Sequence, residues 1–348
     1  MVNNVTDWTS EEGITEEEKI YYYRKAGKIG YEVLNTVKDI IKPGTPIIEI
    51  CETTESMILE KGAEGFGFPT NVSIDNIAAH YSSPYGDENL LPDTGIIKLD
   101  LGVHVNGYIA DTAISVNLSP ELKELKLAAE EGFKAGMEII QIGTLPSVVG
   151  KNIEDTITSY GYLPIRELSG HKLGRYELHG DKRLPNIGVP YDPAEASLQA
   201  GEAFALETFA STGTGSVHEV SGNRYIYMLL PRRVPLRNPV SRKIYSTAYK
   251  KYKTLPFAER WLSSYDNFNR SRVRFALREL INNAGAVAYP PLADEKGSYV
   301  AQYENTFIIT ENEGVIVTTQ PPFEFEMPES LQEKISDDNK QDKENNKE

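Results

Sequence analysis

Residues 99–112 read L-D-L-G-V-H-V-N-G-Y-I-A-D-T, and this stretch decides how the fold is interpreted. Polar and apolar side chains alternate up to Asn106-Gly107, and the alternation resumes after this dipeptide. Asn-Gly is typical of a two-residue hairpin loop, because a type I′ turn needs positive φ at both central positions. The stretch therefore predicts a β-hairpin.

This turn fixes the register of the predicted hairpin. Val105 opposes Tyr108 and Asp111 opposes Gly102, which makes Asp100 a diagonal neighbour of Asp111 on the same face. The other face is apolar apart from one threonine and is expected to lie in a core; its members are Leu99, Leu101, Val103, Val105, Tyr108, Ala110, Thr112 and Ile114.

Two carboxylates on one face repel each other unless a positive charge lies between them. One or two divalent cations would remove the repulsion and use the oxygens as ligands. From the hairpin alone, two solvated surface aspartates are the slightly favoured interpretation, so the rest of the chain must decide.

The composition is that of an ordinary soluble protein of 348 residues, with 40% hydrophobic and 25% charged residues. The single cysteine, Cys51, excludes an intramolecular disulfide and fits a reducing compartment. The N-terminus resembles no signal peptide, and no segment approaches the length of a membrane span. The net charge of −15 argues against a general nucleic-acid binder.

Capping and periodicity predict the remaining elements. The sequence T-E-E-E at 15–18 is a capping box that opens a helix. Helices are expected over 15–41, 45–62, 119–140, 146–159, 239–253, 257–264 and 270–283, and strands over 163–168, 203–209, 299–310 and 315–319.

Glu207 and Glu304 each lie in a strand of otherwise apolar and small residues. The Glu207 strand, A-F-A-L-E-T-F, is apolar on both faces, so its carboxylate is expected to be buried and to need a partner such as a cation. With Asp100, Asp111 and a histidine, these glutamates make an oxygen-rich donor set. Such a set suits Mn²⁺, Fe²⁺, Co²⁺ or Zn²⁺ rather than a structural Cys/His site.

In that order, Asp100, Asp111, His171, Glu207 and Glu304 resemble the ligand pattern of methionine aminopeptidases with the pita-bread fold. Flanking strings resemble the type 2 branch, in its archaeal form without a charged N-terminal extension: F-P-T-x-x-S-x-x-N-x-A-A-H (68–80), S-G-H (169–171), E-T-F-A-S-T-G (207–213), Y-P-P-L (289–292) and A-Q-Y-E-N-T (301–306). The resemblance covers residues 15 to 320.

The resemblance implies an α+β fold, in which helices flank a curved antiparallel sheet. It implies a catalytic domain (15–324) with a helical, winged-helix-like insertion (215–290), preceded by a flexible N-terminus (1–14). The charged composition of residues 325–348, poor in aromatic residues, predicts a disordered acidic tail. The resemblance also implies an aminopeptidase that removes the initiator methionine from nascent chains when the second residue is small. A hydroxide held by two divalent ions (Co, Mn, Fe or Zn) would attack the peptide carbonyl.

The resemblance also assigns roles to single residues. Asp100 would chelate one ion, Asp111 and Glu304 would bridge both, and His171 and Glu207 would complete the other. Glu207 would also shuttle protons, while His80 and His179 would hydrogen-bond the scissile amide and the developing oxyanion. The substrate-binding set is Phe68, His80, Leu178, His179, Tyr289 and Leu292.

The other two histidines match no ligand position: His104 is interpreted as structural and His218 as a surface residue. One position of the methionine pocket, a histidine in eukaryotic relatives, falls near Tyr225. Two alternative functions remain: a proline-specific peptidase of the same fold, and a non-catalytic relative that binds RNA or a partner protein. The presence of all five ligands argues against the non-catalytic relative.

Residues 231–253 of the insertion carry eight basic residues and no acid. Solvated helix faces explain such a segment, and so does an electrostatic contact with the ribosome. The residues are Arg232, Arg233, Arg237, Arg242, Lys243, Lys250, Lys251 and Lys253. We expect a cytoplasmic monomer with no membrane contact.

Overall fold

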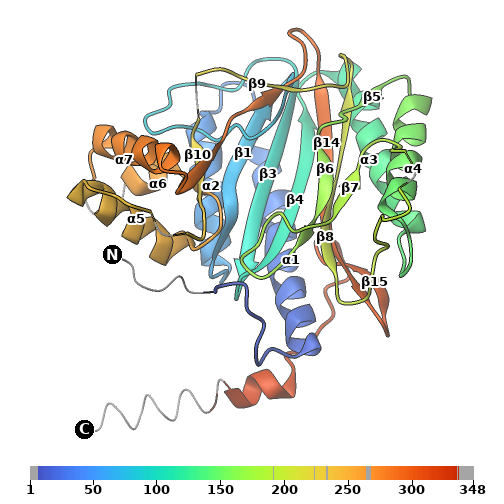
Figure 1. The fold of residues 1–348 in the computed structure, drawn as a ribbon. Helices are drawn as coiled ribbons and strands as arrows, with labels where there is room; N and C mark the ends of the chain where they lie inside the picture. Colours follow the sequence, from blue (N-terminus) through green and yellow to red (C-terminus); the bar gives the residue numbers. More distant parts are fainter. Residues whose placement is uncertain are drawn as a thin grey trace.

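The computed structural model describes residues 7–190, 192–222, 224–232, 234–263, 268–334 and 336. Its central feature is a curved antiparallel sheet in the order β1-β3-β4-β14-β8-β6-β7, with β5 paired to β8 and β15 to β14 (Figure 1). The bounds are β1 Gly65–Ile74, β3 Ile96–Val105, β4 Tyr108–Asn117, β5 Leu163–Pro164, β6 Ser169–Leu173, β7 Arg183–Pro185, β8 Ala203–Ser211, β14 Val300–Thr310 and β15 Gly314–Val317.

The predicted hairpin is confirmed as β3 and β4, in the predicted register. Val105 pairs with Tyr108 and Gly102 with Asp111, and the turn residues Asn106 and Gly107 have φ of 51° and 83°. The apolar face lies in a core with α1 and α2, as predicted, and most of its side chains are fully buried.

Four helices cover this same face of the sheet. α1 (Glu16–Val37) and α2 (Ile47–Glu60) pack behind the β1-β3-β4 part, while α3 (Lys123–Ile139) and α4 (Pro146–Ser159) pack against β14, β8, β5 and β7 (Figure 1). The capping box predicted at Thr15 is present, with Glu18 as its partner. Single 3-10 turns, η1 (Lys38–Ile40) and η2 (Pro120–Leu122), occupy the end of the first predicted helix and the start of the third.

The strands β4 and β14 meet in an unusual seam, because they pair directly at one position, Ala113 with Glu304. Elsewhere side-chain hydroxyls stand between the two backbones. The Ser115 hydroxyl accepts from the Gln302 N–H and donates to its carbonyl (2.8 and 2.9 Å). The Thr306 hydroxyl does the same for Asp111 (2.8 and 2.9 Å). Thr112, the polar member of the core face, donates to the Glu304 carbonyl at 3.0 Å.

The insertion contains more strand than the sequence predicts. Besides α5 (Pro239–Tyr252), α6 (Glu259–Ser263) and α7 (Arg270–Asn282), it includes a three-stranded sheet of β10 (Ile226–Leu229), β11 (Phe257–Ala258) and β12 (Ala286–Tyr289). These elements enclose their own hydrophobic core. A second small sheet joins β9 (His218–Glu219), β13 (Leu292–Ala293) and β2 (Ile77–Ala79).

A buried ion pair attaches the insertion to the main domain. Glu55 of α2 contacts the guanidinium of Arg260 in α6, and it accepts from the indole N–H of Trp261 at 2.7 Å. Arg260 also donates to the hydroxyl of Ser82 (2.9 Å) and the carbonyl of Ser83 (3.2 Å). Only 3% of Arg260 and 7% of Glu55 is exposed.

Three local expectations differ from the structure. Strand pairing over 163–168 stops at Pro164. In the N-terminal segment predicted to be flexible, Trp8 packs against the rings of Tyr176 and Tyr249. In the segment predicted to be disordered, residues 329–334 are helical, and Lys334 donates to the buried Glu18 carboxylate at 2.8 and 2.9 Å. Residues 337–348 lie outside the described residues.

Candidate metal centre

The five predicted ligands lie on five neighbouring strands. Asp100 is on β3, Asp111 on β4, Glu304 on β14, Glu207 on β8 and His171 on β6. Glu304 and Glu207 are direct cross-strand partners. Because side chains of opposed residues point to the same face of a sheet, the donors share the face turned away from the helices.

Small residues complete the pattern of register pairs around these donors. Ala113 lies between Asp100 on one side and Glu304 on the other. Gly102 opposes Asp111, and Ala205 opposes His171. These positions keep bulk away from the carboxylates, so the sheet forms the floor of a polar site.

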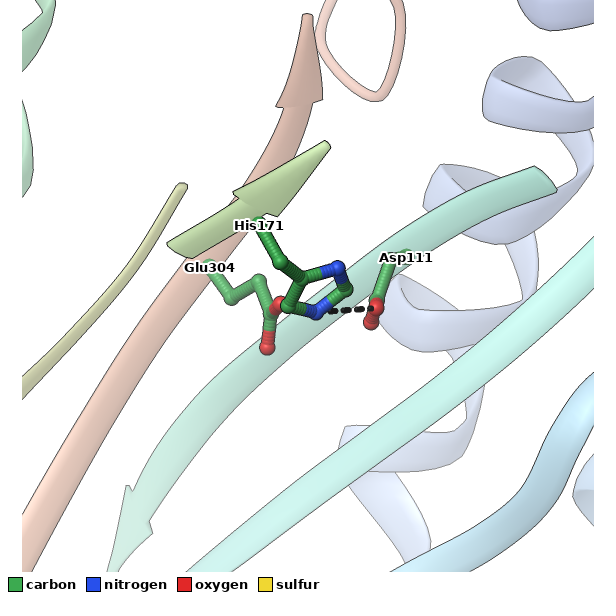
Figure 2. Close-up of side chains that lie close together, drawn as sticks. All are labelled: Asp111, His171 and Glu304. Carbon is green, nitrogen blue, oxygen red and sulfur yellow. Dashed lines mark ion pairs between the residues drawn. The ribbon is translucent and has the colours of Figure 1, made fainter. Parts of the chain in front are cut away.

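Three of the five donors come together most closely. One ligand atom each from Asp111, His171 and Glu304 lies within 4.8 Å of the other two. Figure 2 shows these side chains converging from three strands, and the dashed line joins His171 Nε2 to Asp111 Oδ2 at 3.6 Å. Asp100 and Glu207 lie on the outer two carboxylate-bearing strands of the same floor.

Asp100, Asp111 and Glu304 are buried and Glu207 is half-buried, and few protein donors reach these carboxylates. The Gln302 side chain donates to Glu304 at 2.9 Å, and the Ser169 N–H donates to Glu207 at 3.2 Å. Within the described chain, no hydrogen bond reaches the buried Oδ1 atoms of Asp100 and Asp111. A buried anion that lacks donors is unstable unless a cation balances it.

Burial shifts the protonation of these groups in the directions expected for such a cluster. It raises the pKa values of Asp100, Asp111 and Glu207 well above the usual carboxyl range, and the charge of Glu304 adds to each shift. Burial raises the pKa of Glu304 to about 7 and lowers the pKa of His171 well below its usual value. A neutral imidazole is the form that coordinates a metal ion.

The donor set therefore fits divalent cations. Its four carboxylates and one imidazole match the oxygen-rich preference of ions such as Mn²⁺, Fe²⁺, Co²⁺ and Zn²⁺. The orphaned aspartate oxygens are the positions where a cation would replace missing hydrogen bonds.

A cavity of about 430 Å³ lies over this floor, and all eleven predicted site residues line it. Phe68 of β1, Leu178 of the β6–β7 loop, Tyr289 at the end of β12 and Leu292 of β13 provide apolar surface. Ile226 of β10 and Pro256 extend that apolar wall from the insertion. A hydrophobic pocket beside a polar floor suits an apolar side chain attached to a polar reacting group.

The histidines His80 and His179 stand beside the floor. The ring of His179 lies 4.5 Å from that of His171 and 6.2 Å from that of Tyr289, while His80 meets Tyr289 at 5.5 Å. Burial lowers the pKa values of both His80 and His179 to about 4, so both rings are neutral near pH 7. His80 has φ of 66°, and such outliers cluster at functional sites.

The remaining candidates are placed as follows. His104 is buried against Gly65 and the ring of Tyr176 and does not line the cavity, as expected for a structural histidine. His218 is exposed on β9 and also lies outside the lining. Near Tyr225 it is the neighbouring Ile226 that reaches the cavity.

The sequence interpretation missed two charged lining residues, Arg183 and Glu167. Neither belongs to a recognisable motif. Only the folded structure shows that they line the cavity, Arg183 through the pairing of β7 with β6 and Glu167 through the position of residues 165–168.

The predicted basic segment is largely exposed. Arg232, Arg237, Arg242, Lys243, Lys250 and Lys251 are on the surface. Lys253 differs, because its ammonium lies over the rings of Tyr176 (4.2 Å) and Trp8 (5.2 Å). Arg233 lies outside the described residues. No helix among the described residues is long and apolar enough to cross a membrane.

Curated relatives match almost their whole length. A methionine aminopeptidase of Pyrococcus horikoshii is 40% identical over 296 residues, which cover 85% of this chain and 98% of the relative. A methionine aminopeptidase of Methanocaldococcus jannaschii is 41% identical over 297 residues, covering 85% and 97%.

Solved structures share the fold at lower identity. A thermophilic Arx1 superimposes with a TM-score of 0.77 at 20% identity, covering 90% of this chain and 96% of that one. A methionine aminopeptidase of Thermotoga maritima gives 0.61 at 21% identity, covering 88% and 99%. The model of metallopeptidase family M24 matches residues 22–311. The family model matches most of the chain, and relatives about 40% identical are matched over almost their whole length. This chain belongs to metallopeptidase family M24.

Proposed function

We propose that this protein is a methionine aminopeptidase that removes the initiator methionine from nascent chains whose second residue is small. The observation that carries the proposal is the row of donors Asp100, Asp111, Glu304, Glu207 and His171 on adjacent strands, at the floor of a cavity with an apolar wall. Relatives that bear this name cover 85% of the chain.

Two divalent ions drawn from Co, Mn, Fe and Zn are proposed as the cofactor, and Asp100, Asp111, His171, Glu207 and Glu304 would hold them. When bound, such ions polarise a carbonyl and bring the pKa of water near neutrality. Elemental analysis of metal-reconstituted protein should find two ions per chain, and fewer after His171→Ala.

The protein's own groups then have separate tasks. The neutral rings of His80 and His179 can donate hydrogen bonds to the scissile amide and to the oxygen that becomes negative. Glu207 has one oxygen held by the Ser169 N–H, which leaves the other to accept a proton and return it to the leaving amine. The apolar wall that includes Phe68 and Tyr289 would hold the methionine thioether and exclude water.

Methionine release from Met-Ala-Ser, Met-Lys-Ser and Ala-Pro-Ser tests this proposal against its enzymatic alternative. We expect turnover of Met-Ala-Ser and little of Met-Lys-Ser, since the proposed activity requires a small second residue. Preference for Ala-Pro-Ser would transfer the assignment to a proline-specific peptidase. Turnover of none of the three by metal-reconstituted protein would favour the non-catalytic alternative.

We further propose that the exposed basic residues of 231–253 bring the protein to the ribosome. The segment reverses the sign of a chain of net charge −15, and phosphate contacts of this kind weaken as salt rises. Co-sedimentation with ribosomes across a salt series tests the idea with a variant in which Arg237, Arg242, Lys243 and Lys250 become Glu. Unchanged binding by this variant would contradict it.

A nascent-chain substrate places the protein in the cytoplasm. All five proposed ligands come from a single chain, so the site needs no residue from a second copy, and we propose that the protein acts as a monomer. Analytical ultracentrifugation at assay concentrations checks this.

A further inference from the structure

Arg183 stands at the rim of the catalytic cavity. It lies on β7, directly opposite His171 of β6, so its side chain leaves the sheet on the face that carries the metal ligands. It is the one Lys or Arg among the lining residues of the described chain. Its charge adds to burial in lowering the pKa of His179.

The guanidinium of Arg183 has no assigned partner. In the part of the chain that the structure describes, no hydrogen bond or ion pair engages it. Basic residues beside it are occupied, because Lys172 and Lys182 both contact Glu202 (3.1 and 2.7 Å).

The other charged group at the rim is already bonded. Both carboxylate oxygens of Glu167 accept hydrogen bonds, from the Ser216 hydroxyl at 2.6 Å and from the Val217 N–H at 3.0 Å. Arg183 is thus the charged group at the rim whose hydrogen-bond donors are available to a substrate.

The sheet order indicates which part of a substrate would meet Arg183. Phe68 of the apolar wall is on β1 at one end of the order, and Leu178 of that wall is in the β6–β7 loop. The ligand strands occupy the middle, and Arg183 is on β7 at the other end. A peptide with its first side chain against Phe68 and its first carbonyl over the ligands would continue toward β7.

We propose that Arg183 binds a carboxylate carried by the substrate beyond the scissile bond. The carboxylate comes from an acidic side chain at the third or a later residue, or from the C-terminus of a very short peptide. A planar guanidinium offers paired donors that match a carboxylate. This inference rests on the proposed function and names a substrate preference for that same site.

The test compares peptide amides of the form Met-Ala-Xaa-Ala-Ser, with Asp, Asn or Lys as Xaa, on the metal-reconstituted full chain. A second series compares Met-Ala with Met-Ala amide and so separates a terminal carboxylate from a side chain. Each series is measured with the unsubstituted protein and with Arg183→Gln, Arg183→Lys and Arg183→Glu. Arg278→Gln, an exposed arginine of α7, is the matched control.

We expect the unsubstituted protein to favour the carboxylate peptide over its neutral counterpart by about threefold to tenfold in kcat/KM, in at least one series. The difference should lie mainly in KM, because the contact is remote from the reacting atoms. The preference for the carboxylate peptide should decrease at high ionic strength. It should disappear in Arg183→Gln and persist in part in Arg183→Lys. In Arg183→Glu the protein should instead prefer the peptide with Lys as Xaa. Arg278→Gln should keep the preference.

The inference would be overturned if the kcat/KM ratios of Asp to Asn peptides and of Met-Ala to its amide were the same in the unsubstituted protein and in Arg183→Gln. Turnover of the neutral peptide would in that case still support the proposed function. Failure to release methionine from any peptide would instead refute the proposed function, and the inference would fall with it.

Discussion

Removing one partner of the buried Glu55–Arg260 pair should destabilise the protein strongly. Glu55→Gln keeps the shape of the side chain but removes the negative charge that Glu55 places against the buried Arg260 guanidinium. It also turns an amide NH₂ toward a donor, either the Trp261 indole N–H or the guanidinium. Breaking one side of a buried pair costs about 3–5 kcal/mol, mostly because the remaining charge cannot be solvated.

The size of the expected thermal shift follows from the chain length. At roughly 2 cal/mol/K of unfolding entropy per residue, a loss of 3–5 kcal/mol in a chain of 348 residues lowers Tm by about 4–7 °C. Thermal and urea unfolding followed by circular dichroism measure the loss.

A matched control is the exposed pair of Lys61 and Glu32, whose charged atoms are 2.7 Å apart and whose side chains are 32% and 37% exposed. Glu32→Gln should cost less than about 1 kcal/mol, because water screens and solvates both charges. The double variant Glu55→Leu/Arg260→Met should recover much of the stability lost in Glu55→Gln, since it removes both charges of the buried pair. Equal losses for Glu55→Gln and Glu32→Gln would refute the reasoning.

Three further predictions concern the centre, the thiol and the pocket. His171→Ala should abolish turnover without changing the circular dichroism spectrum, and it should remove the stabilisation of the fold by Mn²⁺, which is about 2.7 kcal/mol at 100 times the Kd. Full activity or full stabilisation of this variant would contradict the ligand role of His171. Burial raises the pKa of Cys51 to about 11, so at pH 8 only roughly one folded molecule in 1,000 carries a thiolate. Ellman's reagent should label it only on unfolding, and stoichiometric labelling of folded protein within minutes would show the thiol to be accessible. Gly102→Ala places a methyl group 2.5 Å from the Phe68 ring and 2.8 Å from the Phe68 backbone nitrogen. This crowding should lower the free energy of unfolding by about 1–3 kcal/mol and raise KM for methionine peptides. Unchanged stability and KM would contradict a tightly packed pocket wall at Phe68.

The hairpin register and the ligand strands could be predicted because local chemistry determines both. Asn106-Gly107 permits one tight turn, and the turn dictates every pair up to Asp100 and Ala113. Family resemblance named the other site residues, and all of them line the cavity.

Other features depend on distant contacts that no local pattern reports. The strands β10 and β12 are four residues each, too short for a periodic signal, and they exist because they pair with each other across the insertion. The segment 325–334 has the composition of a solvated tail, yet Ser330 and Lys334 both bond to Glu18 of α1. Arg183 is an isolated basic residue whose position opposite His171 only the folded sheet reveals.

The hydroxyl seam between β4 and β14 affects the spacing of the ligands. A direct backbone hydrogen bond holds two strands about 4.8 Å apart, whereas a link through a threonine or serine hydroxyl adds the length of that side chain and holds them farther apart. One such link lies at Asp111, two residues from the Ala113–Glu304 pair at which β4 and β14 meet directly. The two carboxylates therefore stand on a seam in which a direct strand contact alternates with hydroxyl links. The hydroxyls of Thr112, Ser115 and Thr306 therefore help to set the spacing between the strands that carry Asp111 and Glu304.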